Sequence, residues 1–143
     1  MKVLIDTNVI LDFMLQRKPY YENAAKIIIL SEKNHIYACI SASAVTDIFY
    51  IANKNLKDKT EALTLLKNLL EIICIAGVAE VDIHKAIDLN WEDFEDAVQY
   101  VIGQNISVDY IITRNPRDFP DSQIQIVSPE KFLAHFISQK QIK

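Results

Sequence analysis

The sequence is poor in the two residues that interrupt secondary structure, with only 2 glycines and 4 prolines in 143 residues. An all-β fold needs many tight turns, in which glycine and proline are common, so their scarcity favours a fold rich in helices. Hydrophobic residues make up 50% of the chain, which is typical of a globular protein and excludes extensive disorder. This length fits one folding unit, and we expect residues 1–143 to form a single domain.

Cysteine and histidine are too few and too scattered to predict a zinc site. The 2 cysteines, Cys39 and Cys74, lie far apart in apolar segments, and neither has a metal-binding spacing around it. The 3 histidines also lack the spacing of metal ligands. We therefore expect both cysteines to be small buried residues in a reducing compartment.

Long hydrophobic runs are lacking as well. The apolar run before Asp6 is too short for the core of a signal peptide. The longest apolar stretch, residues 69–79, is interrupted by Glu71 and is too short to cross a membrane. The sequence therefore predicts a cytoplasmic protein.

The chain has no excess of positive charge, because its net charge is −4 and its pI is about 5.3. Overall charge thus gives no sign of nucleic-acid binding. A cluster of metal-binding carboxylates would lower the pI in the same way, however, and bound cations would reverse the local charge. The acidic pI is therefore compatible with a metal-dependent enzyme that acts on nucleic acid.

The first eleven residues, MKVLIDTNVIL, have the pattern of a strand, an acid and a helix. Residues 3–5 form a short apolar run that ends at Asp6, and the capping residues Thr7 and Asn8 precede another apolar run. This order is typical of a parallel α/β sheet, in which ligands bind beyond the carboxyl ends of the strands. Asp6 is therefore either a functional acid at that edge or only the cap of the following helix.

Further along the chain, short apolar runs alternate with amphipathic segments. The predicted strands are 36–40, 72–75, 110–113 and 124–127, and the predicted helices are 8–15, 20–33, 44–52, 61–70, 82–89, 93–102 and 129–138. Such alternation predicts an α/β fold, in which a parallel sheet has right-handed crossovers and helices on both faces. We expect residues 3–5 to form its central strand.

Polar and acidic residues recur where these strands end or the adjoining helices begin. Asp47 lies in the second turn of the helix after the second strand. Asp93 and Asp96 lie in the first turn of the helix before the fourth strand, and Asn115 and Asp118 follow that strand in the segment TRNPRDF. We expect these groups to cluster with Asp6 at one edge of the sheet.

Each position also has an ordinary structural explanation. Asp47 could lie on a solvent-exposed helix edge, Asp93 and Asp96 could cap their helix and complement its dipole, and Asn115 could belong to a simple turn. Capping alone, however, does not require all of them at one end of the sheet. Converging carboxylates repel one another unless cations lie between them, and oxygen ligands suit Mg²⁺ or Mn²⁺. One or two such ions can activate water and stabilise the leaving oxygen of a phosphodiester.

Four segments of the sequence resemble the PIN-domain ribonucleases, many of which are toxins of bacterial VapBC-type toxin–antitoxin pairs. The segments are LIDTNVILD, SASAVTDIFY, DFEDAVQY and DYIITRNPRDF. The resemblance extends from residue 1 to about residue 136. It implies a three-layer αβα sandwich with a five-stranded parallel sheet, a carboxylate site for Mg²⁺ or Mn²⁺, and hydrolysis of RNA phosphodiester bonds.

Mapped by motif, the resemblance implies that Asp6, Asp47, Asp96 and Asp118 form the catalytic acidic set. Asp6 and Asp96 would bind the metal directly, Asp118 or Asn115 would complete its ligands, and Asp47 would act through bound water, holding it or serving as general base. The sequence departs from the family in two places, because Asp47 replaces a usual glutamate and Asn115 replaces a frequent acid. With one charge fewer, the site should hold a second ion more weakly.

Other residues are expected to support this site. The supporting polar residues are Thr7, Asn8, Asp93 and Thr113, which could hold the acids in place. Arg114 and Arg117 follow the fourth strand and could bind the substrate phosphate, although surface solubility explains them equally well.

Two other functions are compatible with the sequence. A catalytically inactive PIN domain could bind RNA or protein, given the departures at Asp47 and Asn115. A phosphatase of the haloacid-dehalogenase type also begins with a strand and an aspartate, but Asn8 stands where that chemistry uses a second acid.

The resemblance implies RNA as substrate and an antitoxin protein as a possible partner. In addition, the first three helices contain more apolar residues than one sheet face can cover. They are Phe13, Met14, Leu15, Tyr20, Tyr21, Ile27–Leu30, Phe49 and Tyr50. We expect part of this surface to form a homodimer and to remain available to an antitoxin. Alternatively, neighbouring helices cover one another within the monomer.

Overall fold

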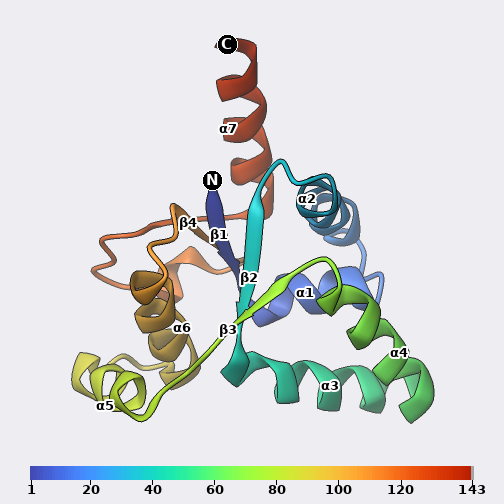
Figure 1. The fold of residues 1–143 in the computed structure, drawn as a ribbon, viewed down its shortest axis with the longest axis horizontal. Coiled ribbons are helices and arrows are strands. Elements are labelled where there is room, and N and C mark those ends of the chain that lie inside the picture. Colours follow the sequence, from blue (N-terminus) through green and yellow to red (C-terminus); the bar gives the residue numbers. More distant parts are fainter. Residues whose placement is uncertain (143) are drawn as a thin grey trace.

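Five parallel strands form one sheet in the computed structural model, which describes the backbone of residues 1–142 and the side chains of residues 1–140 (Figure 1). The strands are β1 (Lys2–Ile5), β2 (Tyr37–Ser41), β3 (Cys74–Ala76), β4 (Tyr110–Ile112) and β5 (Gln125–Val127). Their order across the sheet is β3-β2-β1-β4-β5. The predicted parallel sheet with the first strand at its centre is therefore confirmed.

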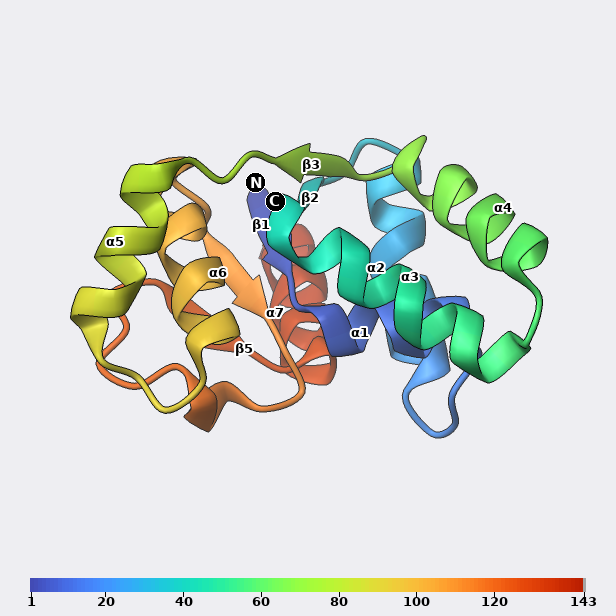
Figure 2. The same ribbon diagram turned by 90° about the horizontal axis from the view of Figure 1, so that it is seen from below.

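Helices cover both faces of this sheet (Figure 2). They are α1 (Thr7–Met14), α2 (Tyr21–Glu32), α3 (Ala42–Leu56), α4 (Lys59–Leu70), α5 (Glu80–Leu89), α6 (Phe94–Asn105) and α7 (Pro129–Ile142), and a 3₁₀ turn, η1 (Pro116–Asp118), follows β4. Side chains of α5 and α6 pack on one face, and those of α1, α2, α3, α4 and α7 form the core on the other. Among the described residues, no helix is both long enough and apolar enough to cross a membrane.

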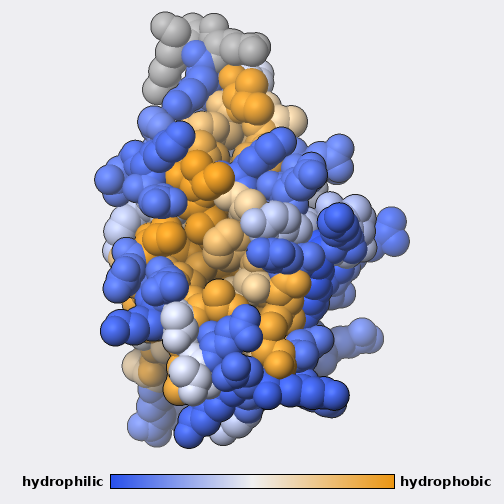
Figure 3. All heavy atoms as spheres, turned by 90° about the vertical axis from the view of Figure 1, so that its right-hand side faces the viewer, coloured by the Kyte–Doolittle hydropathy of each residue, from blue (hydrophilic) through white to orange (hydrophobic). Residues whose placement is uncertain are grey.

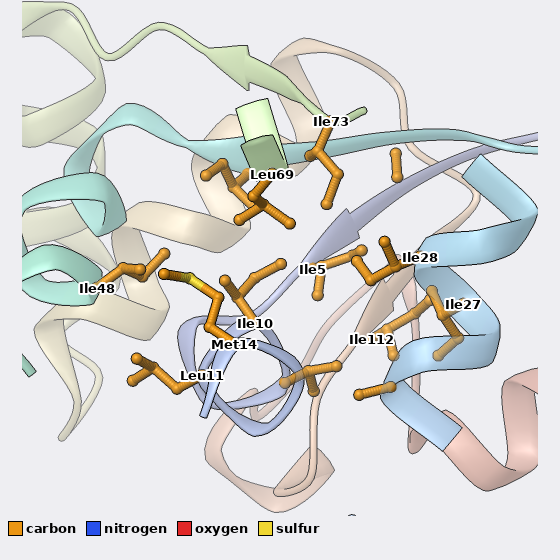
Figure 4. Close-up of a cluster of buried hydrophobic side chains, with 14 of the residues drawn as sticks. Ile5, Ile10, Leu11, Met14, Ile27, Ile28, Ile48, Leu69, Ile73 and Ile112 are labelled. Atoms are coloured by element: carbon orange, nitrogen blue, oxygen red, sulfur yellow. The ribbon is translucent and has the colours of Figure 1, made fainter. Parts of the chain in front are cut away.

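Alternation along the central strand divides the core between the two faces. Val3 and Ile5 of β1 belong to the cluster on the side of α1 and α2, whereas Leu4 belongs to the cluster beneath α6. All three side chains have no exposed surface. Figure 4 shows the first cluster, in which Ile5 and Ile112 of neighbouring strands lie among side chains of the helices. This two-sided burial explains why the strand is an uninterrupted apolar run and not an alternating pattern.

Helix α3 is longer than the predicted range of 44–52. Ser41 is its N-cap, and it continues to Leu56, which packs against the core. Lys57 then adopts a left-handed conformation with φ 55°, and Asp58 caps α4. The longer helix is explained by its two sides, because Lys54 and Asn55 are exposed whereas Leu56 adds core contact that stabilises the last turn.

The cysteines differ from their prediction. Cys39 of β2 is buried, with 3% of its surface exposed, whereas Cys74 of β3 is exposed. The expectation that both are buried is therefore wrong for Cys74, because β3 is an edge strand. The two residues, far apart in sequence, are direct partners in the parallel register of β2 and β3.

The packing of α7 generates a stability prediction. Phe132 is fully buried and lies 5.6 Å from the ring of Tyr110 between centroids. We expect Phe132→Ala to lower the free energy of unfolding by about 3–5 kcal/mol, because it leaves a cavity beside β4. Urea unfolding measures the change. The control, Lys131→Ala on the same helix, changes an exposed side chain and should have an effect of about 0.5 kcal/mol or less.

Candidate active site

Asp6 lies at the carboxyl end of the central strand and also begins α1. Its backbone N–H donates to the carbonyl of Ile112 in β4 at 2.9 Å, and its own carbonyl accepts from the N–H groups of Val9 and Ile10. Asp6 is the N-cap of α1 and is only 5% exposed. Asp6 is therefore confirmed as the cap of α1, and this cap lies at the edge of the sheet where ligands bind in such folds.

Three donors fix the carboxylate of Asp6. Its Oδ1 accepts from the backbone N–H of Thr7 at 2.7 Å and from Nε2 of Gln99 at 2.9 Å, and its Oδ2 accepts from the hydroxyl of Thr113 at 2.7 Å. A carboxylate oxygen can accept two hydrogen bonds. Oδ1 thus has both positions filled, whereas Oδ2 retains one on which Asp6 could bind a cation.

Gln99 was missed by the sequence analysis. It is fully buried on α6, and its Oε1 has no hydrogen-bond partner among the described residues. The available signal was its position, since it lies three residues after Asp96 and interrupts the apolar face of the helix. A buried amide there is explained by its contact with Asp6.

Asp96 lies one turn before Gln99 and is 7% exposed. Its backbone N–H donates to the side chain of Asp93, the N-cap of α6, at 3.0 Å. The pKa of Asp96 is raised to about 8, mainly by burial and then by the negative charges of Asp6, Asp93, Asp118 and Glu95, in that order. Without a cation, Asp96 is therefore protonated over part of the neutral pH range.

Glu95 is a second residue that the sequence analysis missed. Its carboxylate accepts from the hydroxyl of Thr7 at 2.8 Å. Burial raises the pKa of Glu95, the hydrogen bond from Thr7 lowers it, and the charges of Asp47, Asp6 and Asp93 raise it. Asp47, exposed on α3, is thus close enough to act on Glu95. The signal in the sequence was the position of Glu95 in the same helical turn as Asp96.

Asp118 and Arg117 belong to η1 and lie beside the start of α6. With Asp93, they line an open pocket of about 860 Å³. Asn115 lies instead in a second pocket of about 360 Å³, beside Arg114 and away from Asp93. Of the two residues expected to complete the metal ligands, Asp118 therefore shares a pocket with Asp93, and its charge raises the pKa of Asp96.

The structure gives Arg114 partners other than the substrate phosphate. Its Nε lies 2.9 Å from Oδ2 of Asp12, which is 1% exposed, as an ion pair without hydrogen-bond geometry. Its guanidinium also lies over the ring of Tyr20, 4.1 Å from the centroid. Burial raises the pKa of Asp12, while Arg114 and Arg17 lower it. Arg114 therefore anchors the segment after β4 to α1, and we do not assign it to the substrate.

The other residues expected to support the site, Thr113, Asn8 and Asp93, differ in whether they contact the acids. Thr113 is fully buried and also accepts from the backbone N–H of Asn115 at 3.1 Å, so it joins Asp6 to the segment after β4. Asn8 makes no hydrogen bond to the acids among the side chains that the structure describes. Asp93 caps α6, as its ordinary interpretation required, and also adds charge beside Asp96.

A divalent cation fits the chemistry of this site. Within the described residues, no three His, Cys, Asp or Glu side chains are already close enough to hold a metal ion. The charged groups that raise the pKa of Asp96 are nevertheless all carboxylates. Oδ2 of Asp6 retains a free position, and no described basic side chain pairs with Asp96. Hard cations such as Mg²⁺ and Mn²⁺ prefer such oxygen ligands.

Comparison with known proteins identifies the family of the chain. The family model described as PIN domain matches residues 2–117. The chain belongs to the PIN domain family. The matched range includes Asp6, Asp47 and Asp96. It ends just before Asp118, which therefore lies outside the match.

This PIN domain is similar to one curated relative and to several solved structures. It is 28% identical over 136 residues to Ribonuclease VapC1 of Aquifex aeolicus (strain VF5), covering 92% of each chain. The structure of VapBC-1 from nontypeable Haemophilus influenzae has a TM-score of 0.68 and 13% identity, with 91% of this chain and 99% of that chain covered. A toxin–antitoxin complex from Klebsiella pneumoniae has a TM-score of 0.65 and 19% identity, with 89% and 97% covered. At these identities the two structures establish the shared fold.

The raised pKa of Asp96 predicts how the stability of the metal-free PIN domain depends on pH. Between about pH 4 and about pH 8, the folded protein holds a proton that the unfolded chain has lost. The free energy of unfolding should therefore fall as pH rises through this range, and Glu95 adds an effect of the same sign. Asp96→Asn should reduce the slope and stabilise the protein at about pH 8. Urea unfolding in the presence of a chelator measures both effects.

The control is Asp88→Asn, which changes an exposed acid on α5 and should keep the wild-type slope. A wild-type protein whose stability rises steadily across this pH range would contradict the proposed burial of Asp96.

Proposed function

We propose that this PIN domain is a Mg²⁺- or Mn²⁺-dependent ribonuclease and the toxin of a toxin–antitoxin pair. The observation that carries the proposal is the group of mutually repelling acids around the buried Asp6 and Asp96, at the carboxyl end of the central strand. A cation relieves this repulsion and supplies the chemistry for phosphodiester hydrolysis by activating water and stabilising the leaving oxygen. The relative from Aquifex aeolicus is named a ribonuclease, which supports the same activity here.

The residues of the site have distinct roles in this proposal. Asp6 and Asp96 bind the ion, and the donors on Asp6 leave its Oδ2 available. Asp118, whose charge acts on Asp96, completes the ligands. Asp47 holds the attacking water or takes its proton, and Glu95 lies beside it at the start of α6. Arg117, in the same pocket as Asp118, binds the substrate phosphate.

Substitution of Asp96 tests the activity. We expect wild-type protein to cleave RNA with Mn²⁺ or Mg²⁺ but not with a chelator, and Asp96→Asn to lower the rate by about 100-fold or more. Cleavage of a mixed panel of fluorescent oligoribonucleotides measures it. The wild type should also gain thermal stability from Mn²⁺, and the variant should not, because the ion binds only the folded site.

Asp88→Asn should retain both activity and the metal effect. Cleavage that persists with a chelator, or that survives Asp96→Asn, would rule out the proposed site. A wild type that binds RNA without cleaving it would instead support the alternative, an inactive PIN domain that acts as a binding module.

We also propose that this protein forms a homodimer through an apolar face. Figure 3 shows a band of apolar surface on the side of α2, α4 and α7. Within it, Ile29 and Leu30 of α2 and Leu133 and Ile137 of α7 line a groove of about 410 Å³. Of the residues expected to form such a surface, Met14, Ile27 and Ile28 are buried in the monomer, while Tyr20, Ile29 and Tyr50 are exposed. The contribution of α7 was not expected from the sequence.

The similar structures include a toxin–antitoxin complex and a VapBC pair, which supports an antitoxin as the second partner of this chain. An exposed apolar face of this kind suits binding to a second copy of the chain or to an antitoxin.

Sedimentation tests the dimer at micromolar protein concentration. The wild type should sediment as a dimer, and Ile29→Glu should shift it to the monomer, because a charge in the groove would have to be buried. The matched control is Ile87→Glu on α5, which is 56% exposed on the other side of the sheet and should leave the dimer intact. A wild type that is monomeric under these conditions would contradict the proposal.

A further inference from the structure

Cys39 and Cys74 lie directly opposite each other in the parallel register of β2 and β3. Side chains at paired positions of neighbouring strands project from the same face of a sheet. The contact is close enough for the thiol of Cys74 to raise the pKa of Cys39, in addition to the larger effect of burial. Tyr37, two residues before Cys39, lies on the same face, and Cys74 also raises the pKa of its hydroxyl. The two thiols are therefore neighbours across the edge of the sheet.

The backbone geometry is compatible with a covalent bond between them. Neighbouring strands lie about 4.7–4.9 Å apart, and the Cα atoms of a disulfide are about 4.4–6.8 Å apart. The Cβ atoms must approach to about 3.5–4.5 Å, which requires a small shift of one strand. β3 can supply this shift, because it is an edge strand paired only with β2. Gly77, which follows β3, has no atom within 4 Å of the position that a Cβ would occupy.

We propose that Cys39 and Cys74 form a reversible disulfide that joins β2 to the edge strand β3. The oxidant is a small-molecule disulfide of the glutathione class. The thiolate of Cys74 attacks it, forms a mixed disulfide and releases one small thiol. Cys39 then loses its proton and attacks the sulfur of Cys74, which forms the intrachain bond and releases the second small thiol. Two protein thiols are oxidised, one small disulfide is reduced to two thiols, and these take up the two protons.

Exposure determines the order of the two steps. Cys74 is exposed and can meet the oxidant, whereas Cys39 is 3% exposed and burial is the main cause that raises its pKa to about 11. The thiolate is the reactive form of cysteine, so the buried thiol reacts poorly with an oxidant in solution. Once Cys74 carries a mixed disulfide, however, its sulfur lies beside Cys39, and ring closure needs no diffusion.

The bond would close a loop that contains α3 and α4. Restricting this loop in the unfolded chain stabilises the folded protein. The shift required of β3 stores strain in the bond, and strained or exposed disulfides are more easily reduced than relaxed ones. The disulfide is thus expected to stabilise the base of the α3–α4 hairpin while remaining reversible.

The test uses the full chain, reduced, freed of reductant and then incubated with oxidised glutathione. Intact mass should show loss of both thiol hydrogens, and thiol titration in denaturant should fall from two groups to none. The oxidised protein should melt roughly 10 °C higher than the reduced protein. Added dithiothreitol should restore the reduced mass and melting temperature.

Two variants separate the intrachain bond from other products. Cys74→Ser, which changes an exposed side chain, should gain no glutathione and no thermal stability. Cys39→Ala should retain glutathione as a mixed disulfide on Cys74. A wild type that accumulates this mixed disulfide without closing, or that forms a disulfide-linked dimer through Cys74, would overturn the proposal. Because none of these readouts involves RNA, the result does not depend on the proposed ribonuclease activity.

Discussion

The burial of one carboxylate at the centre of the sheet determines much of the surrounding structure. Asp6 receives hydrogen bonds from α1, α6 and the end of β4, through Thr7, Gln99 and Thr113. A buried carboxylate without such partners would cost several kcal/mol, so each donor has to be held in place. This requirement explains a fully buried amide on α6 and a fully buried hydroxyl after β4. The same contacts join both helical layers to the sheet edge.

The acids around Asp6 oppose this stabilisation. Asp96 and Glu95 are placed where burial and neighbouring carboxylates disfavour their charged forms. A structure selected for stability alone would not collect acids in this way, since replacing one of them would reduce the repulsion. The arrangement is explained if a cation is part of the functional state, because each carboxylate is then attracted to the cation, which offsets the repulsion between the carboxylates. The local conflict between stability and charge is therefore the strongest physical argument for a metal-dependent function.

The sequence predicted the framework better than the contacts within it. The positions of the strands along the chain and of Asp6 at the end of the first strand follow from local patterns, since a buried run that ends at an acid needs no knowledge of distant residues. Glu95 and Gln99 were missed because their roles depend on how α6 faces α1, which no local pattern encodes. Arg114 was one candidate for binding the substrate phosphate, but it forms an ion pair with Asp12 of α1. The paired cysteines depended likewise on the register of two strands distant in sequence.

Asp47 is a departure from the family pattern, and a nearby glutamate lies on the facing helix. The aspartate is one methylene shorter than the glutamate usual in the PIN family, and it lies on the exposed side of α3. Glu95, on the facing end of α6, is close enough for the charge of Asp47 to raise its pKa, and the hydrogen bond from Thr7 holds it there. A longer carboxylate is therefore present in this corner, supplied by the opposite helix. In the proposed function, the shorter acid on α3 acts through water, which can bridge polar groups that do not touch directly.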